Sequence, residues 1–333
     1  MRRRHLIAAF AFGFLALSAQ ARDRFYYFGY EVIQVIDGDT DTIVADIPIP
    51  GATREVGVTA DRRFMYVATN RHLVHKVDLA ANRVVSSIDL SNDGWDRLMF
   101  GFTLASDGKT AYGGLMSRKT DGGEVVVGKP VVAQFDLDTG KVIRSVEVPW
   151  GVAHLVSVKD GAEIYAFAQD LYKIDTTGSE LRIVGTVPMF DKGMNILPFW
   201  DYAFENGGVA SMNYYTETSM GLLLIDQKSG AIRDLVVQGD PAMAYSVVLA
   251  PGGKRAYAVM DDLTVIDLAA RRYVASVPNK EGTCYGVNVS SDGRKIYTGG
   301  GGSTVTVYDA KTLKRLKVLK MASDGMDIRR IAF

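Results

Sequence analysis

The sequence predicts an all-β fold that is built from one repeated unit. Short apolar strands end in an aspartate and a turn at seven places along the 333 residues: Asp37, Asp78, Asp136, Asp175, Asp226, Asp267 and Asp309. The spacings between these aspartates are 41, 58, 39, 51, 41 and 42 residues. A period in the forties with no helical pattern is typical of the four-stranded blades of a β-propeller. The predicted fold is therefore a seven-bladed β-propeller.

Each unit also carries a hairpin signal ahead of its aspartate. A polar turn, often Asp-Gly, precedes a β-rich strand at residues 61–66, 107–112, 160–165, 206–210, 252–257 and 292–297. Asp, Asn and Gly tolerate the positive φ angles that tight hairpin turns demand. The order within one blade is therefore strand, hairpin, strand, strand ending in aspartate, turn and strand.

The two ends of the chain complement each other. The first unit, Phe25 to Ile49, lacks an opening strand, whereas an extra strand, Asp327 to Phe333, follows the last unit. We expect this C-terminal strand to pair with the N-terminal blade and close the ring, because closure leaves no unpaired strand edge.

Two units carry extra residues that we expect to form loops on one face. Ser117 to Lys129 is polar and contains glycine, and Pro188 to Tyr202 is rich in aromatic residues and methionine. Loops that interrupt a regular repeat often carry binding functions.

The first 21 residues have the three parts of a secretory signal. Arg2, Arg3 and Arg4 precede an apolar stretch from Leu6 to Leu17, and small residues follow up to Ala21. About twelve apolar residues are fewer than the ~20 of a spanning helix. The prediction is a signal peptide over 1–21, a propeller domain over 22–333, and export to a periplasm without a membrane anchor after cleavage.

Composition argues against several other classes of function. Lys plus Arg equal Asp plus Glu at 38 each, and no basic stretch with interleaved aromatic residues predicts nucleic-acid binding. The single cysteine, Cys284, cannot form an internal disulfide or a haem attachment motif. We find no catalytic triad and no metal-ligand set, so no catalytic, cofactor-binding or metal residue is assigned to this chain.

Aromatic residues recur where the innermost strand of each blade should begin. The position seven residues before the polar turn holds Arg54, Phe100, Ala153, Phe199, Tyr245 and Tyr285. Trp150, His154 and Trp200 lie close to these positions in sequence. The functional interpretation is a recess at one mouth of the central channel that receives a partner or substrate, formed by Phe100, Trp150, His154, Phe199, Trp200, Tyr245 and Tyr285. The alternative is that these rings only pack between blades.

Three stretches resemble a known family. Arg97 to Thr110, Gly207 to Asp226, and Tyr285 through Leu313 are similar to the β subunit of quinohaemoprotein amine dehydrogenase, a propeller of the YVTN-repeat and methylamine dehydrogenase heavy-chain type. The resemblance runs over the predicted mature chain and rests on the combination of these stretches.

That resemblance implies a periplasmic complex of three chains that oxidises primary amines to aldehydes. The partners would be a small γ subunit that carries cysteine tryptophylquinone and an α subunit that is a dihaem cytochrome c. Both cofactors would lie in the partner chains, and this chain would be the non-catalytic propeller that docks them.

Two other functions remain open from the residues alone. One is a stand-alone periplasmic propeller that binds a ligand or a surface protein. The other is an enzyme in its own right, such as a lactonase-like propeller, for which a metal or a paired acid and histidine in the channel would be needed.

Overall fold

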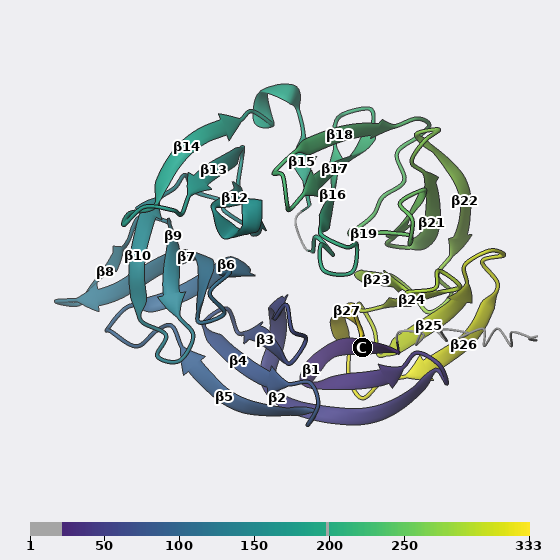
Figure 1. Cartoon of the computed structure of the whole chain (residues 1–333), viewed down its shortest axis with the longest axis horizontal. Helices are drawn as coiled ribbons and strands as arrows, with labels where there is room; N and C mark the ends of the chain where they lie inside the picture. Colours follow the sequence, from purple (N-terminus) through teal and green to yellow (C-terminus); the bar gives the residue numbers. More distant parts are fainter. Residues whose placement is uncertain (1–21, 198–199) are drawn as a thin grey trace, which may run out of the picture.

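The computed structural model describes residues 22–197 and 200–333, and its strands form a closed ring around a central channel (Figure 1). The predicted signal peptide, residues 1–21, lies outside the described residues. Within these two ranges all regular structure is β apart from two short 3₁₀ turns, η1 (Lys159–Gly161) and η2 (Phe190–Lys192). The predicted all-β propeller is confirmed.

The described strands hydrogen-bond into six sheets. The first runs in the order β27 (Gly325–Ala332), β1 (Asp23–Asp37), β2 (Thr42–Val58), β3 (Phe64–Thr69), β4 (Leu73–Asp78), β5 (Arg83–Asp89). The second contains β6 (Asp96–Leu104), β7 (Thr110–Asp121), β9 (Val131–Asp136) and β10 (Val142–Glu147), with β8 (Glu124–Val127) paired to β7. The third contains β11 (His154–Val158), β12 (Glu163–Phe167), β13 (Leu171–Asp175) and β14 (Arg182–Val187).

The remaining three sheets have four strands each. The fourth contains β15 (Asn195–Ile196), β16 (Val209–Tyr215), β17 (Met220–Asp226) and β18 (Ile232–Val237). The fifth contains β19 (Ser246–Leu249), β20 (Arg255–Val259), β21 (Asp262–Asp267) and β22 (Arg272–Pro278). The sixth contains β23 (Gly286–Val289), β24 (Lys295–Gly299), β25 (Thr304–Asp309) and β26 (Arg315–Lys320).

The predicted count of seven separate blades is wrong, because the strands of the first two units are joined in one six-stranded sheet. β1 doubles back at Glu31, where φ is 61°, and its two halves pair with β27 and with β2. β2 likewise pairs with β1 up to Ala52 and with β3 from Thr53 onward, next to Gly51 with φ of 78°. Strand pairing continues directly on both sides of each turn, so no unpaired segment separates the two units.

The strand-ending aspartates behave as the repeat predicts. Asp37, Asp78, Asp136, Asp175, Asp226, Asp267 and Asp309 are each the last residue of a strand. In the last unit the Asp309 carboxylate accepts hydrogen bonds from the N–H groups of Lys311 and Thr312 and from the Thr312 hydroxyl. The Thr312 bonds hold the pKa of Asp309 below its usual value. These local bonds define the turn without help from the rest of the fold.

The core lies between neighbouring strand groups of the ring. One apolar cluster joins the sixth sheet to the first, where Phe25 of β1 stacks on Tyr297 of β24 with ring centroids 3.7 Å apart. Another cluster fills the inside of the bent first sheet, with Tyr26 and Ile33 of β1 against Met65 of β3. The ring is therefore stabilised by contacts between consecutive units around its whole circumference.

The C-terminal strand closes the ring as predicted. β27 pairs antiparallel with the first half of β1, from Asp23 opposite Ala332 to Phe28 opposite Asp327. The pairing extends beyond both strands, because Arg22 and Phe333 exchange backbone hydrogen bonds of 3.0 and 2.9 Å.

Deleting residues 327–333 should therefore lower the melting temperature by roughly 10 °C or more, because it removes the partner of β1 and exposes the cavity left by Ile328 and Ile331. Circular dichroism melts of the truncated and full chains check this. Deletion of Phe333 alone, whose side chain is 44% exposed, is the control and should change the melt far less. Equal melting temperatures for the full chain and the 327–333 deletion would contradict closure by β27.

Candidate functional site

The predicted recess residues occupy different surroundings. Tyr245 and Tyr285 immediately precede β19 and β23, and their rings meet edge to face with centroids 4.8 Å apart. Phe100 lies in β6 next to a bulge at Gly101, and the Arg71 guanidinium carbon is 4.0 Å from the centre of its ring. Tyr245 and Tyr285 thus lie directly before innermost strands, whereas Phe100 lies in the middle of β6.

The other recess residues are spread between surface and core. Trp150 is 58% exposed in the turn before β11, whereas Trp200 is only 6% exposed. Trp200 packs in the cluster that contains Tyr257 and Cys284, between the fifth and sixth sheets. Phe199 lies outside the described residues. A single docking recess that uses all seven residues therefore stays a prediction.

Residues 200–208, which we name the channel segment, occupy the inner side of the fourth sheet as a run of turns rather than a long strand. Asp201 reaches His154 of β11, the Tyr202 hydroxyl donates to Asp327 of β27, and Glu205 accepts from Arg329 of the same strand. The second predicted insertion thus leads into a segment that bridges innermost strands across the channel.

Buried ionic groups hold this segment in place. Arg329 donates to Glu205 through Nε at 2.6 Å and through Nη2 at 3.0 Å. Both side chains are almost fully buried. Removing one member of such a pair would strand a buried charge, which is strongly unfavourable. These residues lie more than 120 positions apart, so no local pattern in the sequence marks them.

His154 is the buried histidine of the channel. Its Nε2 atom lies 2.9 Å from the Asp201 carboxylate, whose other oxygen accepts the N–H of Ala203. Burial is the largest single effect and favours the neutral imidazole. The hydrogen bond and charge of Asp201, together with the charge of Glu55, outweigh burial and raise the pKa of His154. The Nδ1 atom of His154 is buried and has no hydrogen-bond partner among the described residues.

Glu55 of β2 lies close to this histidine. Its carboxylate accepts the N–H of Gly101 at 3.1 Å. Gly101 has φ of 76°, and a side chain there would meet the His154 backbone at 2.8 Å, so glycine permits the close approach of β6 and β11. Burial raises the pKa of Glu55 to about 7, against the opposing charges of His154 and Arg71. The channel therefore holds an acid whose pKa is about 7 close to a histidine whose pKa is raised.

A cavity of about 740 Å³ enters the channel from the end where the innermost strands finish. Its wall includes Val58, Leu104 and Ser157, near the ends of β2, β6 and β11, and it reaches Asp201 and Arg329. Tyr245 and Tyr285 lie before their strands, at the opposite end of the channel. The buried ionic residues Asp201 and Arg329 therefore line this cavity, whereas Tyr245 and Tyr285 do not.

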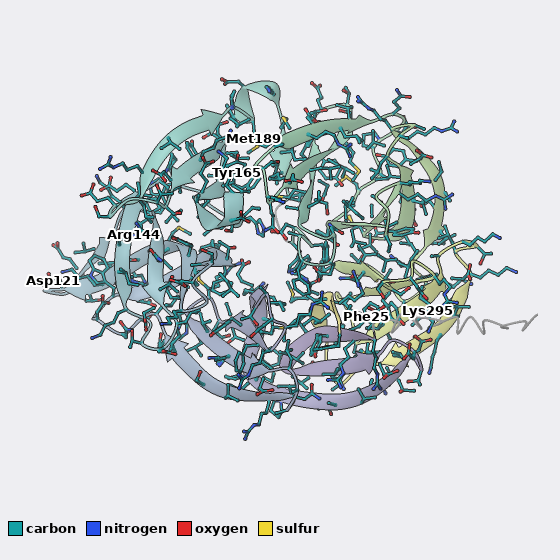
Figure 2. The ribbon with its side chains drawn as sticks, in the orientation of Figure 1. Phe25, Asp121, Arg144, Tyr165, Met189 and Lys295 are labelled. Carbon is teal, nitrogen blue, oxygen red and sulfur yellow. The ribbon has the colours of Figure 1, made fainter. Side chains whose placement is uncertain are left out.

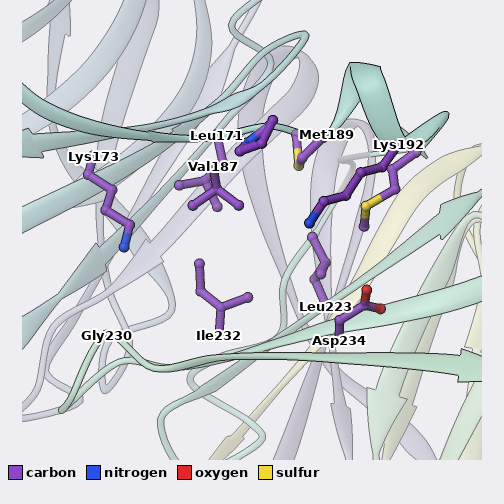
Figure 3. Close-up of a pocket in the computed structure, with 11 residues that line it drawn as sticks. Leu171, Lys173, Val187, Met189, Lys192, Leu223, Gly230, Ile232 and Asp234 are labelled. Atoms are coloured by element: carbon purple, nitrogen blue, oxygen red, sulfur yellow. The ribbon is translucent and has the colours of Figure 1, made fainter.

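A second cavity of about 410 Å³ lies between the third and fourth sheets (Figure 3). Leu171, Val187, Met189, Leu223 and Ile232 supply its apolar walls. Lys173, Lys192 and Asp234 add charged groups, drawn around the same space in Figure 3.

The first predicted insertion, Ser117 to Lys129, forms an ordered hairpin arm rather than an irregular loop. β7 runs on past its pairing with β9 and pairs with β8, and the tip at Asp121 projects outside the ring (Figures 1 and 2). Every residue of β8, Glu124–Val127, is exposed.

Within residues 22–197 and 200–333, no group of three or more His, Cys, Asp or Glu side chains is placed to hold a metal ion. None of the helical segments in that part of the chain is long and apolar enough to cross a membrane.

Comparison with solved structures supports the fold. The chain is similar to hydrazine synthase of Kuenenia stuttgartiensis, with 15% identity, a TM-score of 0.56, and coverage of 88% of this chain and 90% of that one. It is similar to the dihydro-haem d1 dehydrogenase NirN, with 15% identity, a TM-score of 0.59, and coverage of 92% and 74%. It is also similar to AztD of Citrobacter koseri, with 13% identity, a TM-score of 0.56, and coverage of 94% and 99%.

The sequence itself has no match among protein-family profiles or curated proteins. At these identities the structural likeness establishes the β-propeller fold, and function must be argued from the sites.

Glu55 gives a test of the buried cluster. Because its pKa in the folded protein is about 7 and its ordinary value is 4.5, the wild type should lose about 3 kcal/mol of stability between pH 4.5 and pH 7. In this range the carboxyl ionises in the unfolded chain but stays protonated in the folded protein. Glu55→Gln removes this loss, so the variant should gain stability over the wild type between pH 5 and pH 8 in urea unfolding. The exposed Glu217→Gln is the control. A stability difference between E55Q and wild type that is independent of pH would contradict the placement of Glu55.

Proposed function

We propose that this chain is a non-catalytic β-propeller that docks other protein chains. The observation that carries the proposal is the hairpin arm of β7 and β8. Val125 is 64% exposed and Val127 is 61% exposed, and the outer edge of β8 pairs with no described strand. An exposed β-branched edge strand invites pairing with another chain, and proteins that do not use such an edge usually block it.

The arm favours an extended segment of a different protein over a second copy of this chain. β8 has four residues, and a symmetric β8–β8 contact would bury much less than the ~1,200 Å² typical of a stable interface. A partner strand added to this edge would gain main-chain hydrogen bonds, and the valines would give it an apolar contact. The partner would then extend over neighbouring surface, such as the exposed Leu98 of β6.

The specific form of this role comes from the sequence resemblance. According to this resemblance, the chain is the β subunit of a periplasmic quinohaemoprotein amine dehydrogenase. This subunit would dock the small γ subunit that carries cysteine tryptophylquinone and the α subunit that is a dihaem cytochrome c. Signal cleavage near Ala21 would deliver the chain to the periplasm. The aromatic mouth around Phe100, Tyr245 and Tyr285, together with the exposed Trp150, would be a second contact for these partners.

Lysine on the arm tests the docking surface. The double variant Val125→Lys and Val127→Lys should abolish copurification of partner chains from the native source, because two charges would enter an apolar strand pairing. Val85→Lys, at a 43% exposed valine of outer strand β5, is the control and should leave the assembly intact. Undiminished copurification with V125K/V127K would reject the arm as the docking surface.

The identity of the partners is tested separately. Native complexes purified through this chain should show haem and quinone absorbance and oxidise primary amines. A monomer without partners would instead support the stand-alone binding propeller, and amine oxidation by the isolated chain would overturn the non-catalytic role.

A further inference from the structure

Two arginines come together at the aromatic end of the channel. Arg71 lies in the turn between β3 and β4, and backbone hydrogen bonds tie this turn to both neighbouring innermost strands. The Asn70 N–H donates to Ala52 of β2 at 3.2 Å, and the Arg71 carbonyl accepts the Met99 N–H of β6 at 2.6 Å. Arg54 lies in β2 two residues after Ala52. The turn therefore holds Arg71 beside Arg54 and against the ring of Phe100.

Neither guanidinium forms a hydrogen bond or an ion pair with any residue in the described part of the chain, although both side chains are partly buried. Burial and the nearby charge of Arg54 lower the pKa of Arg71, and Glu55 acts in the opposite sense. Two adjacent like charges destabilise the fold by mutual repulsion, and the charge of Glu55 opposes this effect at Arg71. An oxyanion bound between them would relieve this repulsion and match the donor geometry of the guanidinium groups.

The backbone at Arg71 is also in an unusual state. His72 N–H donates to the Thr69 carbonyl at 3.3 Å, which leaves Asn70 and Arg71 as the two turn residues, with φ of 51° and 64°. Hairpin turns of this kind favour glycine at the second position, since a side chain there adds strain on the order of 1 kcal/mol. Arg71 therefore occupies a turn position at which glycine is preferred.

A further unsatisfied group lies behind the arginines. The buried Nδ1 atom of His154 has no partner among residues 22–197 and 200–333, and the charges of His154 and Glu55 act on each other. In the protonated imidazole this atom is a hydrogen-bond donor. The charge of Glu55 acts on both His154 and Arg71, so this imidazole belongs to the same group of charges as the arginines.

We propose that Arg54 and Arg71 form a binding site for the carboxylate or phosphate group of a small molecule at the aromatic mouth of the channel. Arg71 is positioned by Phe100 and by the strained turn. This site uses no residue of the β7–β8 arm, so it stands or falls independently of docking at the arm, although it shares Phe100 with the second contact proposed above.

Isothermal titration of the full chain at constant ionic strength tests the site, with inorganic phosphate and succinate as separate probes. The expected result is saturable binding of at least one probe, weakened about tenfold or more in Arg54→Gln and in Arg71→Gln, because each removes a charged donor. Arg83→Gln, an exposed arginine of β5, is the control for net charge and should bind like the wild type. Preference for phosphate or for succinate identifies the oxyanion.

Melting curves of each variant distinguish loss of the site from loss of the fold. If R54Q or R71Q unfolds, Arg71→Lys provides the second variant, since it keeps the charge and removes the guanidinium fork. The proposal is overturned if neither probe saturates the wild type, if R54Q and R71Q bind as the wild type does, or if R83Q loses binding equally.

Discussion

The pairing of the last strand with the first is the constraint on which the rest of the structure depends. β27 follows the final repeat and lies beside the first half of β1, so one sheet contains both ends of the described chain. Its apolar residues, Ile328 and Ile331, join core clusters on both sides. Because each unit packs mainly against its two neighbours, a ring left open at this point would expose apolar faces at two sites.

The same strand brings the buried charges into the channel. Asp327 and Arg329 come from β27, and their partners Tyr202 and Glu205 come from the channel segment. Closing the ring and satisfying these buried groups are therefore one event. Burial raises the pKa of Asp327 to about 7, while Arg329 opposes that shift. A single arginine thus balances carboxylates from two distant parts of the chain, which makes the network sensitive to the position of β27.

The sequence predicts the repeat well because each unit carries local signals. The aspartate turns and the Asp-Gly hairpins depend on residues two or three apart, and both occur where the pattern places them. The joining of the first two units could not be predicted in this way. It depends on β1 and β2 continuing to pair while they change partners at Glu31 and Gly51, and neither residue differs from those of an ordinary turn.

The candidate site is predicted only in part. Alignment of the repeat predicts aromatic residues at the starts of the inner strands, and Tyr245 and Tyr285 do lie directly before such strands. In the same alignment Arg54 occupies a position that is mostly aromatic in the other units, so the alignment gives no reason to expect a charged site there. The pairing of Arg54 with Arg71 arises from two strands and a turn, so no local motif contains it. The one available signal is the Asn70–Arg71 turn, where Asn-Gly would be the expected pair.

Native-state hydrogen exchange of the backbone amides tests the closed ring most directly. Amides of β27 and of the first half of β1 should be protected to nearly the same extent as the central strands and should exchange together, because opening one removes the partner of the other. Rapid exchange of residues 325–332, as in a frayed terminus, while the central strands stay protected, would contradict the account.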